Sequence, residues 1–316
     1  MEKMIKKMIL FIRSMRIYQW VKNVFIFAPM IFSLHRSQID YVKDGLQALL
    51  AFVLFSLVTG SIYVFNDCID KEKDRLHPDK KKRPIASGAL GIGTAASAAA
   101  VLLLLTLFAV FMFNVYFFYI ALVYIFMNIV YSTFLKKIVI LDVMVIAVGF
   151  VLRVEIGGVI NHIKLSPWIL IITFLLAIFL GLVKRRQELI KVNALESAAF
   201  TGSEPGLNPG TGIQTRKTLK KYNLSLLDQL ISITTATTLI SYVVYVTNPG
   251  IQEKFHTDKL YLTVPFLVFG IFRYLYLTYV KGKGESPSEI IFSDIPFTFN
   301  AFLWVSVFIF LMLIKA

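Results

Sequence analysis

The stretch that decides the fold is LQALLAFVLFSLVTGSIYVFNDCIDKEKD, residues 46–74. Its first part is almost wholly apolar and is long enough to cross a bilayer, which takes a helix of about 20 residues. Its last part, from Asn66 onward, is acidic, and a dense group of basic residues follows within 75–83. An apolar helix that ends in carboxylates beside cations predicts a membrane span with a polar site where the helix reaches water.

Similar apolar runs recur along all 316 residues. Hydrophobic residues make up 57% of the chain and the mean hydropathy is +0.71, which is untypical of a soluble domain. We expect an all-α, polytopic membrane protein whose residues 1–316 form a single domain. The expected spans, nine in all, are 24–40, 45–65, 91–113, 115–135, 138–160, 166–184, 226–247, 260–280 and 295–314. The first is the weakest, because His35 and Arg36 interrupt it.

The basic residues are concentrated on one side of the predicted membrane. The net charge is +14, and most of the 33 Lys and Arg residues lie before the first span and in alternate loops, chiefly 66–90 and 185–225. The positive-inside rule makes these segments and the N-terminus cytoplasmic, in the plasma (inner) membrane. Residues 1–22 are expected to form a basic amphipathic helix at the interface. Topology thus explains the charge without nucleic-acid binding, and the single cysteine, Cys68, excludes an intrachain disulfide.

Oxygen-bearing side chains repeat at helical spacing in the acidic motif. If the helix continues, Asn66, Asp70 and Asp74 share one face, and Asp67 aligns with Asp74 at i+7. Mg²⁺ prefers oxygen ligands and is usually held by one or two carboxylates plus substrate phosphates. We therefore predict Asn66, Asp70 and Asp74 as metal ligands and Asp67, Asp70 and Asp74 as catalytic carboxylates. The alternative is a solvated acidic helix end without function.

Cations near the motif are candidates for binding phosphate. Arg83 precedes a tight turn between Pro84 and Gly88, which we expect to hold it near the carboxylates. Lys22 and Asn23 lie where the first apolar run begins. The full predicted substrate-binding set is Lys22, Asn23, Arg75, Arg83, Lys136, Arg153, Lys184, Arg185 and Glu188.

Charged residues within spans are costly and usually face a partner or a cavity. Arg153 is such a residue, and an ion pair with Glu155 or with another helix explains it as well as a substrate contact does. Asp142 lies near Lys136 in the sequence and is expected to orient that lysine.

The motif Asn-Asp-x-x-Asp-x-x-x-Asp in a polytopic helical protein resembles the UbiA superfamily of intramembrane prenyltransferases. Other blocks resemble one branch, the decaprenyl-phosphate phosphoribosyltransferases, and together they cover essentially the whole chain. These blocks lie at 19–23, 75–86, 131–136, 149–153, 184–189 and 265–276.

The resemblance implies Mg²⁺-dependent transfer of 5-phosphoribose from phosphoribosyl diphosphate to a polyprenyl (decaprenyl) phosphate, with release of diphosphate. Its implied partners are these two substrates and the membrane, and a homo-oligomer is compatible with it. Other UbiA enzymes carry a second Asp-x-x-x-Asp motif after the sixth span, where this chain has Lys184, Arg185, Arg186 and Glu188. Basic residues in place of this acidic motif favour direct binding of substrate phosphates. A prenyltransferase acting on an aromatic or other acceptor remains an alternative, as does a transporter.

Overall fold

The computed structural model describes residues 2–32, 40–76, 80–200, 219–282, 290 and 293–313, and every regular element in these ranges is a helix. Within the described ranges, eight helices are long and apolar enough to cross a membrane. These helices are α3 (Tyr41–Ile69), α5 (Ile92–Phe113), α6 (Val115–Thr133), α7 (Leu141–Ile160), α8 (Pro167–Phe200), α9 (Leu224–Thr247), α11 (Val264–Tyr279, preceded by the 3₁₀ helix η5, Lys259–Thr263) and α13 (Ile295–Leu313). They correspond to eight of the predicted spans, so the all-α membrane fold is confirmed.

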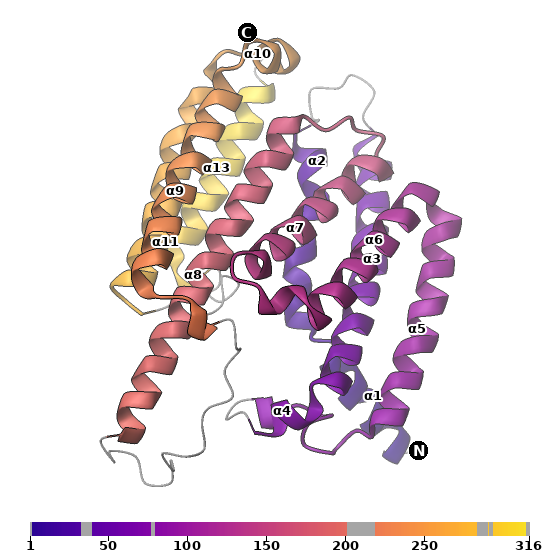
Figure 1. The fold of residues 1–316 in the computed structure, drawn as a ribbon. Coiled ribbons are helices and arrows are strands. Elements are labelled where there is room, and N and C mark those ends of the chain that lie inside the picture. The colour runs from indigo at the N-terminus through magenta and orange to yellow at the C-terminus, as the bar shows by residue number, and fades with distance from the viewer. Residues whose placement is uncertain are drawn as a thin grey trace.

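The helices form one bundle, in which α8 stands between two groups (Figure 1). Helices α9, α11 and α13 pack together on one side of α8, and α7 on its other side leads to α3, α5 and α6. Large apolar side chains remain exposed on the outer helices, for example Leu104, Leu105 and Phe108 on α5. Such an outer surface fits a lipid environment, because in water it would be an unusually large apolar patch.

The weakest predicted span, 24–40, is not one continuous helix in the part of the chain that the structure describes. It begins within a 3₁₀ helix, η1 (Ile17–Phe27), and continues into the short α2 (Ala28–Ile31), while 33–39 lies outside the described residues. Pro29 occupies the first turn of α2, a position where its missing N–H costs no hydrogen bond. The buried amide of Asn23 further ties η1 to its neighbours rather than leaving it a simple apolar span.

Glycine lets η1 pack directly on α7. A Cβ atom at Gly157 would lie only 2.0 Å from the carbonyl oxygen of Ile26, far inside van der Waals contact. A second close approach occurs at Gly60 of α3, where a Cβ atom would lie 2.8 Å from Met15. These two glycines therefore allow the segment 15–26 to lie against α3 and α7, which fixes where Lys22 is held.

The end of α3 leads into a group of short elements, which we call the site end of the bundle. It comprises α4 (Lys71–Arg75), η2 (Lys80–Lys82) and η3 (Leu135–Lys137). The N-terminal helix α1 (Glu2–Ser14) and the far end of α8 lie toward the same end (Figure 1). Exposed Met4, Ile5 and Met8 fit an interfacial position for α1. The single helix predicted for 1–22 is wrong at its end, because α1 ends at Ser14 and η1 begins at Ile17.

The prediction of a loop at 185–225 is wrong for residues 185–200, because α8 continues to Phe200. Arg185 and Arg186 do not end the helix, since each is neutralised by an acidic side chain of another helix, Asp142 and Asp228 respectively. The Gly- and Pro-rich segment falls in 201–218, outside the described residues, and the chain resumes at η4 (Leu219–Lys221).

Candidate active site

The acidic motif lies across the break between α3 and α4. The helical hydrogen bonds continue through the break, from the Asp70 N–H to the Asn66 carbonyl (2.9 Å) and from the Asp74 N–H to the Asp70 carbonyl (2.8 Å). Asp70 itself adopts φ −90° and ψ 9°, which separates the two helices. The near-continuous helical path keeps the motif residues at the site end, close to their predicted spacing.

Arg83 bridges two of the motif's carboxylates. Its Nη1 donates to Asp67 Oδ1 at 3.0 Å and to Asp74 Oδ2 at 2.6 Å, and both carboxylates are buried. Asp67 and Asp74 are seven residues apart, two turns of helix, so one guanidinium reaches both. Gly88, with φ 81°, lies in the turn that follows Arg83, where the Ser87 N–H donates to the Arg83 carbonyl at 2.8 Å. The expected proximity of Arg83 to the carboxylates is therefore confirmed.

Arg16 is a member of this cluster that the sequence analysis treated only as a topological charge. It lies immediately before η1 with φ 54° and ψ 57°, donates to Asp67, and stands 5.1 Å above the Tyr63 ring. Its position beside the block 19–23 was the only sequence signal available. Contact with Asp67 depends on how η1 packs on α3, which the sequence does not specify.

The two other predicted ligands have different partners. The carboxylate of Asp70 pairs with Lys73 at 3.2 Å and with Lys136 at 3.7 Å, and about a third of it is exposed. The amide oxygen of Asn66 accepts a hydrogen bond from Ser132 Oγ at 3.1 Å. The structure thus brings Lys136 to the motif as predicted, through α6 and η3.

Lys22 lies among other cations. Burial is the largest cause that lowers the pKa of its ammonium from 10.5 to about 7, and the neighbouring charges of Lys184, Arg153 and Arg16 contribute to the same shift. Like charges held together in a low-dielectric site repel one another, and a bound anion would relieve that repulsion. This group, which we call the cationic cluster, is defined as Arg16, Lys22, Arg153 and Lys184.

Arg153 is held by hydrogen bonds within the protein. Its Nε donates to Asn23 Oδ1 at 2.8 Å, its Nη1 to the Gly149 carbonyl at 2.5 Å and its Nη2 to Tyr124 Oη at 3.2 Å. Asn23 in turn donates to Ser56 Oγ at 2.8 Å. Asn23 therefore braces η1 against α3 and α7, and the expectation that it binds phosphate is not supported by its orientation. The expected ion pair of Arg153, with Glu155 or with another helix, is not present among the described residues, because the hydrogen-bond partners of Arg153 are all neutral.

Asp142 pairs with Arg185 and not with Lys136. It is fully buried, and accepts from Arg185 Nε at 2.7 Å and from Tyr222 Oη at 2.8 Å. The expectation that Asp142 orients Lys136 is wrong, because Lys136 reaches Asp70 instead. Arg185 also donates to Glu188 at 2.6 Å. Two predicted substrate-binding residues thus belong to a network that joins α7 to α8.

Tyr222 connects this network to the strained start of α7. Its hydroxyl accepts from the Ile140 N–H at 2.7 Å, and burial raises the pKa of this hydroxyl. Ile140 has φ 72°, a conformation that a β-branched residue rarely adopts. The hydrogen bond holds the connection between η3 and α7, which carries Lys136 to the motif.

Arg75 lies apart from the cluster of carboxylates. Its Nε donates to the Ala86 carbonyl at 3.1 Å and its Nη1 approaches Glu72 at 3.4 Å. These contacts brace the turn that carries Arg83. The predicted contact of Arg75 with substrate stays a prediction.

The donor atoms of the motif suit a hard divalent cation, since all of them are carboxylate or amide oxygens. In the described part of the chain, however, no three acidic, histidine or cysteine side chains converge as a metal cage. The arrangement fits an ion held by one or two carboxylates, with substrate phosphate oxygens completing its coordination. The assignment of Asn66, Asp70 and Asp74 as its ligands stays a prediction.

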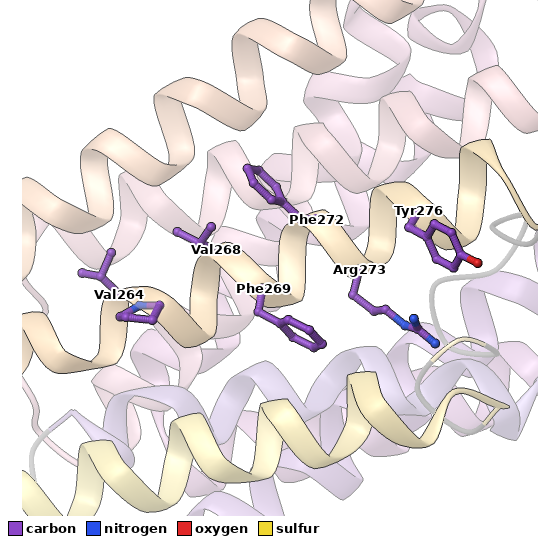
Figure 2. A pocket seen from close by; sticks show the side chains of 7 residues that line it. Val264, Val268, Phe269, Phe272, Arg273 and Tyr276 are labelled. Carbon is purple, nitrogen blue, oxygen red and sulfur yellow. The ribbon is translucent and has the colours of Figure 1, made fainter.

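A separate groove lies on α11, beside α13 (Figure 2). Its volume is about 550 Å³, and its lining residues are Val264, Pro265, Val268, Phe269, Phe272, Arg273 and Tyr276. Arg273 is bound to Asp294 by two hydrogen bonds, of 3.1 and 2.8 Å. The groove shares no residue with the acidic motif or the cationic cluster, and its one lining cation is already neutralised.

Comparison with known proteins identifies the family. The model of the UbiA prenyltransferase family matches residues 25–187. A decaprenyl-phosphate phosphoribosyltransferase of Mycolicibacterium smegmatis is 29% identical, over 90% of this chain and 86% of that protein. One of the same name from Corynebacterium glutamicum is 29% identical, over 93% of this chain and 84% of its own length.

A solved structure gives the same answer for the fold. A UbiA homologue from Archaeoglobus fulgidus, bound to DMAPP and Mg²⁺, superposes with a TM-score of 0.64. That match covers 96% of this chain and 99% of the other at 17% identity, a level that speaks for the fold alone. Together, the family match, the curated relatives and the shared helical fold show that the chain is a multi-pass membrane transferase and belongs to the UbiA prenyltransferase family.

Proposed function

We propose that the protein transfers 5-phosphoribose from phosphoribosyl diphosphate to a polyprenyl phosphate, with release of diphosphate and with Mg²⁺ as cofactor. The observation that carries this proposal is the placement of the cationic cluster beside the acidic motif. A donor with a diphosphate and a 5-phosphate, together with a lipid phosphate, brings three anionic groups to one site. Four cations from three segments of the chain, η1 with its cap, α7 and α8, match the charge of three anionic groups better than that of one diphosphate.

Arg83 and Lys136 are the residues that bind the departing diphosphate. Both reach the acidic motif, at Asp74 and Asp70 respectively, so both are held next to the predicted metal ligands. Mg²⁺, when bound by Asn66, Asp70 and Asp74, supplies charge neutralisation of the leaving group. The guanidinium of Arg83 adds directed hydrogen bonds to the same oxygens as their charge grows.

Lys22 and Lys184 bind a second phosphate, that of the lipid acceptor. Lys22 belongs to η1, which packs against α3 and α7, and Lys184 reaches it from α8. Within the basic stretch 184–186, Arg185 and Arg186 form ion pairs with Asp142 and Asp228, and Lys184 is the residue whose charge acts on Lys22. Basic residues at this place, where related enzymes have a second acidic motif, also argue against a second metal site.

The chemistry requires little acid or base assistance. The bond between C1 of ribose and the diphosphate oxygen breaks, and its electron pair leaves with diphosphate. An oxygen of the acceptor phosphate forms the new bond to C1 from the opposite face. Because that oxygen is already anionic, no side chain has to remove a proton. The protein supplies positioning and charge stabilisation, which are the main resources for such a displacement.

We further propose that the site end faces the cytoplasm across the plasma membrane, with α1 at the interface and residues 1–316 forming a single membrane domain. The concentration of basic residues in this part of the chain supports that orientation. A cytoplasmic site would meet phosphoribosyl diphosphate directly, since this soluble donor does not cross a bilayer unaided.

The decisive experiment offers the purified protein radiolabelled phosphoribosyl diphosphate, Mg²⁺ and decaprenyl phosphate, followed by lipid extraction. Label in the lipid fraction, dependent on all three additions, is the expected result. A parallel reaction replaces the donor with a prenyl diphosphate and an aromatic acceptor. Turnover only in that parallel reaction would establish a prenyltransferase and refute the phosphoribosyl proposal.

A further inference from the structure

The carboxylates of the acidic motif are already neutralised by basic side chains. Asp67 binds Arg16 and Arg83, Asp74 binds Arg83, and Asp70 binds Lys136 and Lys73. Asp67 and Asp74 are moreover 3% and 5% exposed, so water offers these two little alternative solvation. In the absence of ligands, the negative charge of each of these carboxylates is therefore already balanced by a basic side chain.

A divalent cation arriving alone meets unfavourable electrostatics. It would add two positive charges beside the cationic cluster, and it could gain Asp74 as a ligand only by displacing Arg83. A displaced guanidinium in a partly buried site then lacks its partner, which is costly. A diphosphate that arrives with the cation removes both costs, because it neutralises the metal and offers Arg83 new oxygen acceptors.

We propose that Arg83 couples the binding of the divalent cation to that of diphosphate. In the absence of ligands it occupies Asp67 and Asp74, and it transfers from Asp74 to a diphosphate oxygen when the metal–diphosphate complex enters. Arg83 thus exchanges one acceptor for another, and this exchange makes metal and diphosphate bind together. This inference rests on the proposed function only in taking diphosphate as a ligand of the site.

The test measures Mn²⁺ binding to the full-length protein in nanodiscs, by titration with electron paramagnetic resonance, with and without inorganic diphosphate. For the unaltered protein we expect weak binding of Mn²⁺ alone and tightening by diphosphate of roughly 5- to 150-fold, the usual range for coupled sites. Titrations account for the Mn²⁺–diphosphate complex formed in solution. By linkage, Mn²⁺ should tighten diphosphate binding by the same factor.

Arg83→Met frees Asp74, while Asp67 keeps its ion pair with Arg16. Mn²⁺ alone should therefore bind more tightly to this variant, and the coupling factor should fall toward one. Lys82→Met is the matched control, because it removes one positive charge from an exposed neighbour and should leave the coupling unchanged. Arg83→Lys, which keeps the charge, should retain part of the coupling and serves if the Met variant fails to fold. Fluorescence-detected size exclusion establishes folding of each variant.

Tight binding of Mn²⁺ alone to the unaltered protein, or a coupling factor unchanged by both Arg83 variants, would overturn the inference. Because the probes are Mn²⁺ and inorganic diphosphate, the outcome is independent of which group is transferred. Coupling without phosphoribosyl transfer would refute the proposed function alone. Transfer without coupling would refute the inference alone.

Discussion

Lys22 offers a prediction whose size follows from the electrostatics of the cationic cluster. Its pKa is lowered from 10.5 to about 7. In the ligand-free protein above neutral pH its ammonium is therefore largely deprotonated, and binding of a phosphate must bring back the proton. When a ligand restores the charge fully, affinity should fall about tenfold for each pH unit above about 7. The window from about pH 7.5 to 9.5 avoids the titration of the phosphate itself, whose second pKa is about 6.

The assay is isothermal titration of the protein with farnesyl phosphate, a soluble prenyl phosphate, across that pH window. Repeating it at about pH 8 in buffers of different ionisation enthalpy should reveal uptake of roughly 0.9 proton per phosphate bound. Lys22→Met should bind weakly with a flat pH profile, and Lys22→Arg should bind with a flat profile because arginine stays charged. A Lys22→Met profile as steep as that of the unaltered protein would refute the reasoning.

The same shift predicts how stability depends on pH. The unfolded chain holds the Lys22 proton up to about its ordinary pKa of 10.5, while the folded protein loses it near 7. Between these values the unfolded state binds more protons, so stability should rise with pH through this window. At neutral pH the lowered pKa of Lys22 reduces the free energy of unfolding by on the order of 4 kcal/mol. Lys22→Met should therefore raise the melting temperature of the empty protein at pH 7 even as it weakens phosphate binding.

Three further substitutions test the site and the fold. Asp70→Ala should abolish transfer without lowering expression, as measured by lipid-borne label and membrane yield; retained turnover would remove Asp70 from the metal site. Arg153→Met leaves buried hydrogen-bond acceptors unsatisfied, and each such acceptor should lower the free energy of unfolding by roughly 1–3 kcal/mol. The variant should therefore melt at a lower temperature, and an unchanged melting temperature would contradict the bracing role. Gly157→Ala places a methyl group 2.0 Å from the Ile26 carbonyl and should destabilise the protein strongly, whereas Gly93→Ala, with open space around it among the described residues, should not. Equal melting temperatures for these two variants would disprove the close packing of η1 on α7.

Most of the fold could be predicted because membrane spans are local features of the sequence. A helix such as α5 needs only a long enough apolar run, and its bounds of Ile92–Phe113 lie within a residue or so of those expected. The exceptions are places where tertiary partners override local character. In α8, charged residues continue a helix because acids on α7 and α9 neutralise them. The expected span at 24–40 begins instead within η1, which is held by the buried amide of Asn23 and by the close contact of Ile26 with Gly157.

The helical membrane architecture, the acidic motif and the turn after Arg83 could all be predicted, since they depend on residues close together along the chain. Which charges meet, in contrast, depends on how the helices pack. Arg16 reaches Asp67 across 51 residues, and Arg153 reaches Asn23 across 130. The physical reason is that spacing along one helix fixes which side chains share a face, whereas contacts between helices depend on how their surfaces pack, through features as small as the missing side chain of Gly157.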